Sequence, residues 1–152
     1  MKHHFLLDEN ILHHAVRGVD RHDNPDLTSS TLILFIARNC HRIILNDFLR
    51  KRYQAHLEQL KSVKSQVFNP LFLVTQLVYN SSKFIMQYDN PPRLPSGCDI
   101  PAEDVDVVRA ALISHPIFVS AEEELRTAIN NCEALHLRAI DAGEALHLAQ
   151  ET

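Results

Sequence analysis

The sequence predicts an α/β domain built on a parallel sheet, because short apolar runs that end in polar residues alternate with longer helical patterns. Three runs have the composition of buried strands: 4–8, 41–47 and 116–120. The first two flank a helical segment and form a strand-helix-strand unit, which places its strands in parallel with a right-handed crossover.

Length and composition fit one soluble domain, predicted to span residues 1–152. Hydrophobic residues make up 45% of the chain and charged residues 22%, as in ordinary globular proteins. No apolar run approaches the ~20 residues of a membrane span, and the first residues lack a signal-peptide pattern. We therefore expect a cytoplasmic protein without a membrane partner. The net charge of -4 gives no overall reason to expect nucleic acid, so RNA or DNA would need a local patch.

The cysteines of the chain are three in number: Cys40, Cys98 and Cys132. They are far apart and form no Cys-x-x-Cys pair, so the sequence suggests neither a set of disulfides nor a zinc site. We expect all three to be reduced and mostly buried.

The region after the first strand is predicted to be a loop followed by a helix. Residues 13–26 are rich in His, Arg, Asp, Gly and Pro, which is typical of a surface loop. Hydroxyl side chains at 28–30 can cap a helix over 31–38, which leads into the second strand. Asp8, which ends the first strand directly, has no evident local capping role.

The middle of the chain shows two helical patterns and one long loop. Apolar spacing predicts a helix from 48 to about 64 and another over 70–86. Residues 87–99 hold three of the seven prolines and are predicted to form a loop without regular structure. A loop of this length is often functional.

Two more helices are expected around and after the third strand. One starts near Asp99, with a proline and acids in its first turn, and runs to Leu112. Ser120 and Glu123 then match a capping box at the head of the next helix. The tail, 132–152, is rich in Ala, Leu, Glu and His and is predicted to form one further helix.

Three carboxylates are expected to meet at one edge of the sheet. Asp8 follows the first strand, Glu122 follows the third, and Asp104 stands in the first turn of the helix before the third. Carboxylates converging there would repel one another unless a cation neutralised them, and oxygen ligands suit Mg²⁺ or Mn²⁺. Such a metal can activate water for attack on a phosphodiester.

Each acid also has a purely structural interpretation. Asp104 and Glu123 are explained equally well as first-turn and capping-box acids. Glu122 and Glu124 fit a solvated run of charge. Asp8 favours a functional interpretation, because α/β proteins place their ligands where buried strands end.

A cluster of basic residues follows the second strand. Five of the fifteen basic residues lie between positions 50 and 64: Arg50, Lys51, Arg52, Lys61 and Lys64. A helix carrying them can contact phosphates, and such contact weakens steeply with salt. A solvated helix face is the commoner meaning of a charge run.

Other familiar sites are disfavoured. The ten histidines show no metal-binding spacing, so His13 and His14 are interpreted as surface residues, and His136 and His147 as solvent-facing residues of the last helix. Only three glycines occur, and none forms a phosphate-binding loop or a Gly-x-Ser-x-Gly motif.

Two segments resemble motifs of the PIN-domain nucleases. Leu7-Asp8-Glu9-Asn10-Ile11-Leu12 is similar to the family's opening Asp-x-Asn-Val/Ile-Leu, and Val119-Ser120-Ala121-Glu122-Glu123-Glu124-Leu125 to its Val-Thr-x-Asp-x-x-Leu. Asp104, followed by Ala111, resembles the family's internal acidic helix. The resemblance spans nearly the whole chain in order and spacing, and the nearest subgroup is the toxin-like PIN proteins of prokaryotes.

The resemblance implies an α/β/α sandwich and a metal-dependent endoribonuclease acting on single-stranded RNA. It implies that Asp8, Asp104 and Glu122 are catalytic and bind Mg²⁺ or Mn²⁺, with Asn10 orienting Asp8. A toxin of this kind would have an antitoxin protein as its partner. The apolar helix at 71–78 also leaves room for a homodimer surface.

One residue departs from the family's pattern. The family usually carries a Glu before a Tyr on the helix after the second strand, and here Arg52 precedes Tyr53. Asp47, at the end of the second strand, can supply a carboxylate from a different direction. A cation beside a Mg²⁺ site opposes metal binding by repulsion. A second hypothesis is therefore a catalytically inactive PIN-like module that binds RNA or a protein partner.

Overall fold

A five-stranded parallel sheet forms the centre of the fold. The computed structural model describes residues 2–61 and 70–151, to which all structural statements below refer. The strand order is β3-β2-β1-β4-β5, and every neighbouring pair is parallel. The strands are β1 (His4–Leu7), β2 (Arg42–Leu45), β3 (Phe84–Met86), β4 (Ile117–Val119) and β5 (Arg138–Ile140). The predicted α/β class with a central parallel sheet is confirmed.

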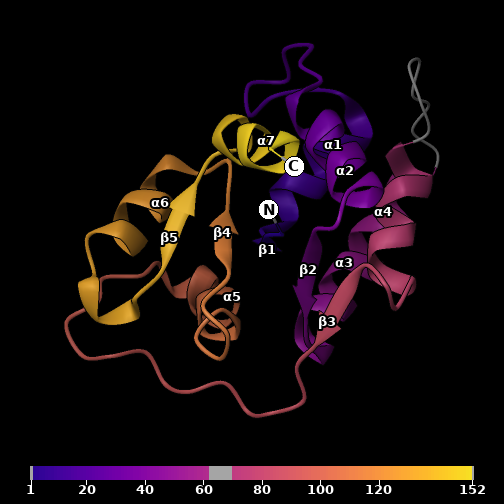
Figure 1. Cartoon of the computed structure of the whole chain (residues 1–152). Coiled ribbons are helices and arrows are strands. Elements are labelled where there is room, and N and C mark those ends of the chain that lie inside the picture. Colours follow the sequence, from indigo (N-terminus) through magenta and orange to yellow (C-terminus); the bar gives the residue numbers. More distant parts are fainter. Residues whose placement is uncertain (1, 62–69, 152) are drawn as a thin grey trace.

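Helices flank this sheet (Figure 1). They are α1 (Glu9–Arg17), α2 (Thr28–Arg38), α3 (Asp47–Leu60), α4 (Pro70–Tyr79), α5 (Val105–Ala110), α6 (Glu123–Asn130) and α7 (Ala142–Gln150), with short 3₁₀ helices at Ala102–Asp104 and Glu133–Leu135. The chain runs outward from β1 to β3 and then returns to β4 on the other side of β1. Right-handed crossovers therefore place α1 to α4 on one face and α5 and α6 on the other. Helix α7 returns to the first layer, where it packs on α2.

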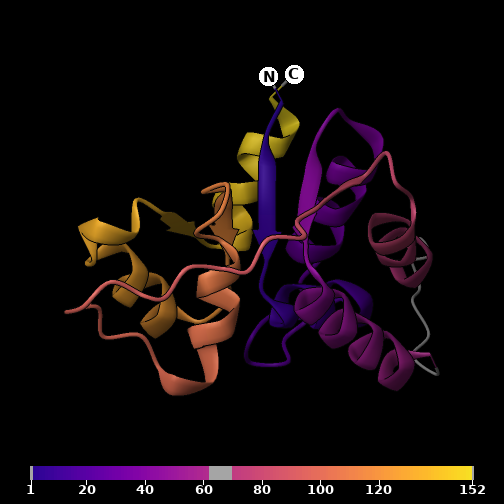
Figure 2. The ribbon, with the colours of Figure 1, turned by 90° about the horizontal axis from the view of Figure 1, so that it is seen from below.

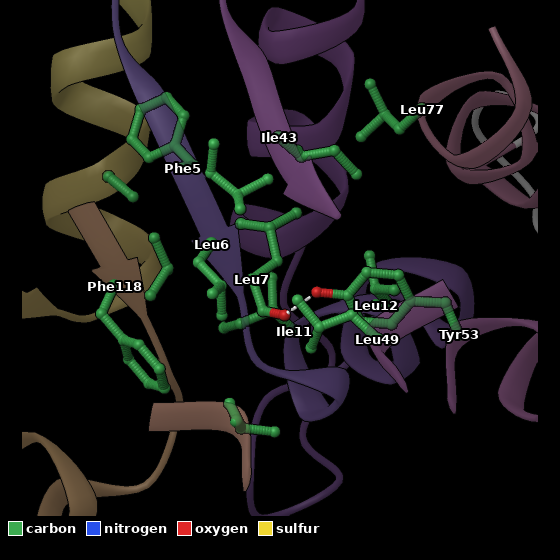
Figure 3. Packing of buried hydrophobic residues seen from close by; sticks show 14 of the residues in the cluster. Phe5, Leu6, Leu7, Ile11, Leu12, Ile43, Leu49, Tyr53, Leu77 and Phe118 are labelled. Carbon is green, nitrogen blue, oxygen red and sulfur yellow. Dashed lines mark hydrogen bonds between the residues drawn. The ribbon is translucent and has the colours of Figure 1, made fainter. Parts of the chain in front are cut away.

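Strand β1 is buried on both of its faces. Phe5, Leu6 and Leu7 have no exposed surface, as expected for the middle strand of a covered parallel sheet. Figure 3 shows these side chains among Ile43 and Phe118 of the neighbouring strands. Burial of this apolar surface supplies the main driving force for the fold.

The end of β1 is fixed from two sides. The buried Tyr53 of α3 donates its hydroxyl hydrogen to the carbonyl oxygen of Leu7, as the dashed line in Figure 3 shows. On the other side, the backbone N–H of Asp8 donates to the carbonyl oxygen of Val119 at 2.8 Å. The strand order reverses between β1 and β4, which is where open α/β sheets form a crevice for ligands.

The structure corrects the expectation of a loop over 13–26. Helix α1 already covers Glu9–Arg17, and it ends at Gly18, whose φ of 67° is the left-handed conformation that favours glycine at a helix end. Asp8 is the N-cap of this helix and accepts a hydrogen bond from the Glu9 N–H. Contrary to the sequence interpretation, Asp8 therefore does have a local capping role.

Two strands were missed because their short apolar runs were assigned to longer helical patterns. The helix expected over 70–86 ends at Tyr79, and Phe84–Met86 forms edge strand β3. The tail expected to be one helix contains Glu133–Leu135, Arg138–Ile140 and α7. A short apolar run next to a helical pattern cannot be assigned to strand or helix by periodicity alone.

The helix starts around the third strand also differ from expectation. Pro101, not Asp99, precedes the 3₁₀ turn that leads into α5, and α5 ends at Ala110 rather than Leu112. The capping box proposed for Ser120 and Glu123 is wrong, because Glu122 occupies the N-cap and makes no side-chain capping bond.

Other expectations are confirmed. The helix over 31–38 lies within α2, the helix from 48 is α3, and residues 87–99 have no regular structure. Residues 62–64 of the third predicted helix lie outside the described part of the chain. Among the described residues, no helix is long and apolar enough to cross a membrane.

The interpretation of the cysteines was wrong in two respects. Cys98 and Cys132 form a disulfide, with their Cα atoms 5.5 Å apart, and Cys40 is free and exposed. The sequence gives no sign of this pairing because the two residues are 34 positions apart and belong to a loop and a helix end.

Candidate metal centre

Asp8 is positioned at the junction of β1 and α1. Its side chain is only 4% exposed and accepts three hydrogen bonds. Oδ1 accepts from the Glu9 N–H at 2.9 Å, and Oδ2 accepts from Asn10 Nδ2 at 3.1 Å and from Ser120 Oγ at 2.8 Å. These bonds fix the orientation of the carboxylate without covering it with a positive charge.

Asn10 joins the ends of β1 and β4. Besides donating to Asp8, its Nδ2 lies 3.5 Å from Ser120 Oγ, and its Oδ1 accepts from the Ala121 N–H at 3.2 Å. The amide can do this because it carries donors and an acceptor on one side chain. Its contacts are those of a residue that orients Asp8.

Ser120 is a central residue of the site, although sequence reasoning gave it only a capping role and a place in the motif at 119–125. It is completely buried, donates to Asp8, and accepts from the Glu122 N–H at 3.1 Å. Its position directly after β4, across from Asp8, is the signal that could have identified it. The hydroxyl thereby couples two of the candidate ligands.

Asp104 belongs to the helical layer on the other face of the sheet, the layer that contains α5. It ends the 3₁₀ turn before α5 and is 9% exposed. Its Oδ2 is buried and has no hydrogen-bond partner among the described residues. A buried carboxylate oxygen without a donor costs free energy unless something else satisfies it.

The structure brings Asp8, Asp104 and Glu122 together. One ligand atom from each lies within 4.8 Å of those of the other two, and Glu122 is the exposed member. The three come from β1, the turn before α5, and the start of α6, so only the folded sheet assembles them. Their convergence agrees with the sequence-based expectation for the acidic edge.

The electrostatics of the cluster disfavour the state in which all three carboxylates are ionised. Burial, followed by the charges of Glu122 and Asp8, raises the pKa of Asp104 from 3.8 to about 6. Burial is also the largest cause that raises the pKa of Asp8, with Glu122 adding to it, while the Ser120 hydrogen bond opposes the shift. A bound cation would relieve both effects.

The residues present fit a small divalent cation. All three donors are carboxylate oxygens, which are the ligands that Mg²⁺ and Mn²⁺ prefer. The unsatisfied Asp104 Oδ2 is the atom that most needs such a partner. Asp47 is not part of the cluster, because it is exposed in the first turn of α3 while Asn46 caps that helix.

A second charged group lies beside the cluster. Glu9 accepts two hydrogen bonds from Arg52, from Nε and Nη2, each at 2.9 Å, and lies 3.0 Å from His56 Nε2. The guanidinium also lies over the Phe48 ring at 5.3 Å. Its charge partly offsets the rise in the pKa of Asp104. Sequence reasoning missed Glu9 because it did not predict α1, which carries that residue.

The basic residues of α3 have different surroundings. Arg50 donates to the Val78 carbonyl at 3.1 Å and lies over the Phe84 ring at 4.7 Å, which ties α3 to α4 and β3. Lys51 is exposed, and Lys61 is paired with Glu58. Lys64 lies outside the described residues.

The histidines named in the sequence analysis differ in exposure. His147 is exposed on α7, as expected, whereas His13 and His14 are half-buried on α1 rather than fully at the surface. His136 is also exposed, but it follows the 3₁₀ turn instead of lying on the last helix.

A pocket of about 1010 Å³ adjoins the acidic cluster. Its wall is formed by α1, the loop before α5, and α6, and includes Asn10, His14, Glu122 and Cys132. A ligand larger than a single metal ion can therefore reach the carboxylate site through this pocket.

In comparisons with known proteins, no family model and no curated protein matches this chain. The strand order and the acidic cluster are consistent with the PIN-like resemblance noted in the sequence.

Proposed function

We propose that this protein is a PIN-like, divalent-metal-dependent endoribonuclease that hydrolyses phosphodiester bonds in single-stranded RNA. The observation that carries the proposal is that Asp104 clusters with two further carboxylates while its buried Oδ2 has no hydrogen-bond donor among the described residues. An acidic edge kept only for solubility would not bury one of its acids in this state.

Each residue of the site has a distinct role in this proposal. Asp8, Asp104 and Glu122 hold Mg²⁺ or Mn²⁺, which when bound supplies an activated water and stabilises the charge that develops on phosphate. Asn10 and Ser120 hold the Asp8 carboxylate in one orientation. Such supporting bonds are as much a part of a metal site as its ligands.

The place of the site in the fold supports the same proposal. The cluster lies at the carboxyl ends of β1 and β4, where the strand order reverses, and the adjoining pocket opens beside it. The parallel sheet and the acidic cluster are consistent with the PIN-like resemblance. An antitoxin protein is a further proposal that rests on this resemblance, and a homodimer is one that rests on the apolar helix at 71–78.

A catalytically inactive module that binds RNA or a protein is the second candidate function. Arg52 favours it, because a cation replaces the Glu usual in the family and lies close enough to affect Asp104. Glu9 bears on the choice, since it neutralises Arg52 through two hydrogen bonds. The pair therefore places less net positive charge beside the cluster than Arg52 alone.

Calorimetric titration with Mn²⁺ tests the proposed metal site. We expect saturable binding to the wild type near pH 7.5, loss of binding in Asp8→Asn, and retention in Asp47→Asn. Asp47 is the matched control because it is an exposed strand-end acid outside the cluster. A folded wild type that binds no Mn²⁺ would rule the site out.

Cleavage of short single-stranded RNA separates the enzyme from the inactive module. The enzyme is expected to cut RNA with Mn²⁺ and to lose that activity in Asp104→Asn. Metal binding without cleavage of any RNA in a broad sequence pool would favour the inactive module.

A further inference from the structure

The disulfide lies between the two chain segments that carry Asp104 and Glu122. Cys98 is six residues before Asp104, and Cys132 is ten residues after Glu122. The covalent ring formed by residues 98–132 therefore contains two of the three candidate metal ligands. Asp8, the third, is held separately by Ser120 and Asn10.

The segment before Asp104 is a long connection with few other attachments. Figures 1 and 2 show the chain passing from β3 across to the end of α6 and then back to α5. Hydrogen bonds from Arg109 to the carbonyl oxygens of Pro91 and Pro92, each at 2.9 Å, hold its first part. Over 93–100, the described contacts are the disulfide and the apolar packing of Leu94, Cys98 and Ile100.

The same disulfide forms part of the pocket wall. Cys132 lines the pocket, as do Gly97 and Asp99 on either side of Cys98. The wall also includes Asn10 and Glu122 of the acidic site. The bond between the loop and the residue that follows α6 thus helps to fix the shape of the space next to the carboxylates.

We propose that the Cys98–Cys132 disulfide is a reversible redox control of the carboxylate site. In the oxidised protein it holds the Asp104 segment against α6, so that Asp104 and Glu122 stay close despite their repulsion. Reduction releases residues 93–100 and lets the two carboxylates separate. This inference deepens the proposed metal-dependent function and rests on it for the effect on metal binding.

The reductant that this step needs is a dithiol. One thiolate of the dithiol attacks a sulfur of the disulfide to form a mixed disulfide, and its second thiol displaces the remaining cysteine. Two electrons and two protons pass to Cys98 and Cys132, and the dithiol becomes a disulfide. Both cysteines are half-buried and Cys132 borders the pocket, so a reductant has a route to the bond.

The remaining thiol, that of Cys40, can be removed so that it does not interfere with the redox test. Cys40 is free and exposed and precedes β2, whereas the acids follow the ends of β1 and β4, at the opposite edge of the parallel sheet. Cys40→Ser therefore removes disulfide exchange without touching the site. All samples carry this substitution, and the reduced sample is treated with dithiothreitol and desalted without oxygen before measurement.

Two measurements compare the oxidised and reduced proteins. The first is the Kd for Mn²⁺, which we expect to rise about tenfold on reduction if roughly a tenth of the reduced protein keeps the ligands together. The second is the rate of tryptic cleavage after the exposed Arg93, followed by mass spectrometry and expected to rise on reduction. Cys98→Ser should resemble the reduced protein with or without reductant, and Cys132→Ala provides a second variant if Cys98→Ser folds poorly.

The outcomes separate this inference from the proposed function. Equal Kd values and equal cleavage rates in the two redox states would overturn the redox control. Faster cleavage after Arg93 with an unchanged Kd would also overturn it, because the loop would then move without affecting the metal ligands. If neither state binds Mn²⁺, the proposed metal site fails, and the inferred control of metal binding fails with it.

Discussion

The hydroxyl of Ser120 donates a hydrogen bond to Oδ2 of Asp8 at 2.8 Å, although the two residues are 112 positions apart in the sequence. Each directly follows a strand of the central pair, β1 and β4, whose last residues Leu7 and Val119 are register partners. The carboxylate therefore receives its orientation from the neighbouring strand rather than only from its own helix.

Ser120→Ala should weaken metal binding by removing this bond. We expect the Kd for Mn²⁺ to rise about tenfold, as is typical when a residue that supports a metal ligand is lost. The pKa of Asp8 should rise further, because the Ser120 hydrogen bond is the largest of the interactions that oppose its rise on burial. Calorimetry measures the affinity, and Ser120→Thr, which keeps the hydroxyl, is the control. Equal Mn²⁺ affinity in Ser120→Ala and the wild type would show that Ser120 does not support the metal site.

Asp104 should make the metal-free protein less stable as the pH rises. Its pKa is about 6 in the folded protein and 3.8 in the unfolded reference, so the folded state holds the proton more tightly between these values. The stability that this proton contributes is complete below pH 4 and is lost as pH rises through about 6. Urea unfolding with EDTA at pH 4, 5, 6 and 7.5 should show Asp104→Asn gaining stability over the wild type as pH increases. A constant difference across this range would contradict the raised pKa.

Arg52→Glu should strengthen metal binding while weakening the fold. Replacing Arg52 by an acid changes the charge beside the cluster by two units. At on the order of 0.5–1 kcal/mol per screened unit, this favours Mn²⁺ by about 1–2 kcal/mol, or about five- to thirtyfold in Kd. The variant also places two acids together, because Glu9 loses its partner. The double variant Glu9→Gln/Arg52→Glu should recover stability and keep the tighter binding. Unchanged Mn²⁺ affinity in both would mean that Arg52 does not act on the metal site.

Arg50 and Lys51 should differ in their effects despite being neighbours. Arg50→Ala is expected to lower the free energy of unfolding by about 1–2 kcal/mol, because it loses a hydrogen bond to the Val78 carbonyl and the contact with Phe84. Lys51→Ala should leave stability unchanged and weaken RNA binding at low salt. Urea unfolding and fluorescence anisotropy with labelled RNA measure the two effects. Equal RNA affinity in the wild type and Lys51→Ala would exclude this side of α3 from the RNA contact.

Reducing the disulfide should lower global stability as well. Its cysteines are 34 positions apart, a loop for which constraint of the unfolded chain contributes about 3–4 kcal/mol. Urea unfolding of Cys40→Ser with and without reductant measures this difference. A loss of less than about 1 kcal/mol would contradict this prediction and would show that the reduced, unfolded chain keeps the two cysteines close together without the bond.

The sequence was most informative where strong local patterns coincide with burial. The apolar run at 4–7 and the acids after it could be placed correctly, because a central strand must be apolar on both faces and must end in polar residues at the sheet edge. The three carboxylates followed from the same reasoning. Strands β3 and β5 could not be placed in this way, because each adjoins a helical pattern and only pairing with a neighbouring strand distinguishes it from a helix.

Contacts between distant segments could not be predicted from one sequence. Nothing local indicates that Glu9 pairs with Arg52, or that Cys98 meets Cys132. Both pairs depend on the angle at which loops and helices cross, which is set by packing. A local contact was also missed: the helix-capping bond of Asp8 was overlooked because the first helix was mistaken for a loop.

The long separation between Asp8 and Ser120 has a consequence for synthesis. During translation, β1 emerges first and can pair with β2, but its other edge stays empty until β4 has been made. A chain stopped before residue 120 would carry the first carboxylate with neither its hydroxyl partner nor Glu122. A ribosome-bound nascent chain therefore has no assembled acidic site until most of its own messenger RNA has been translated.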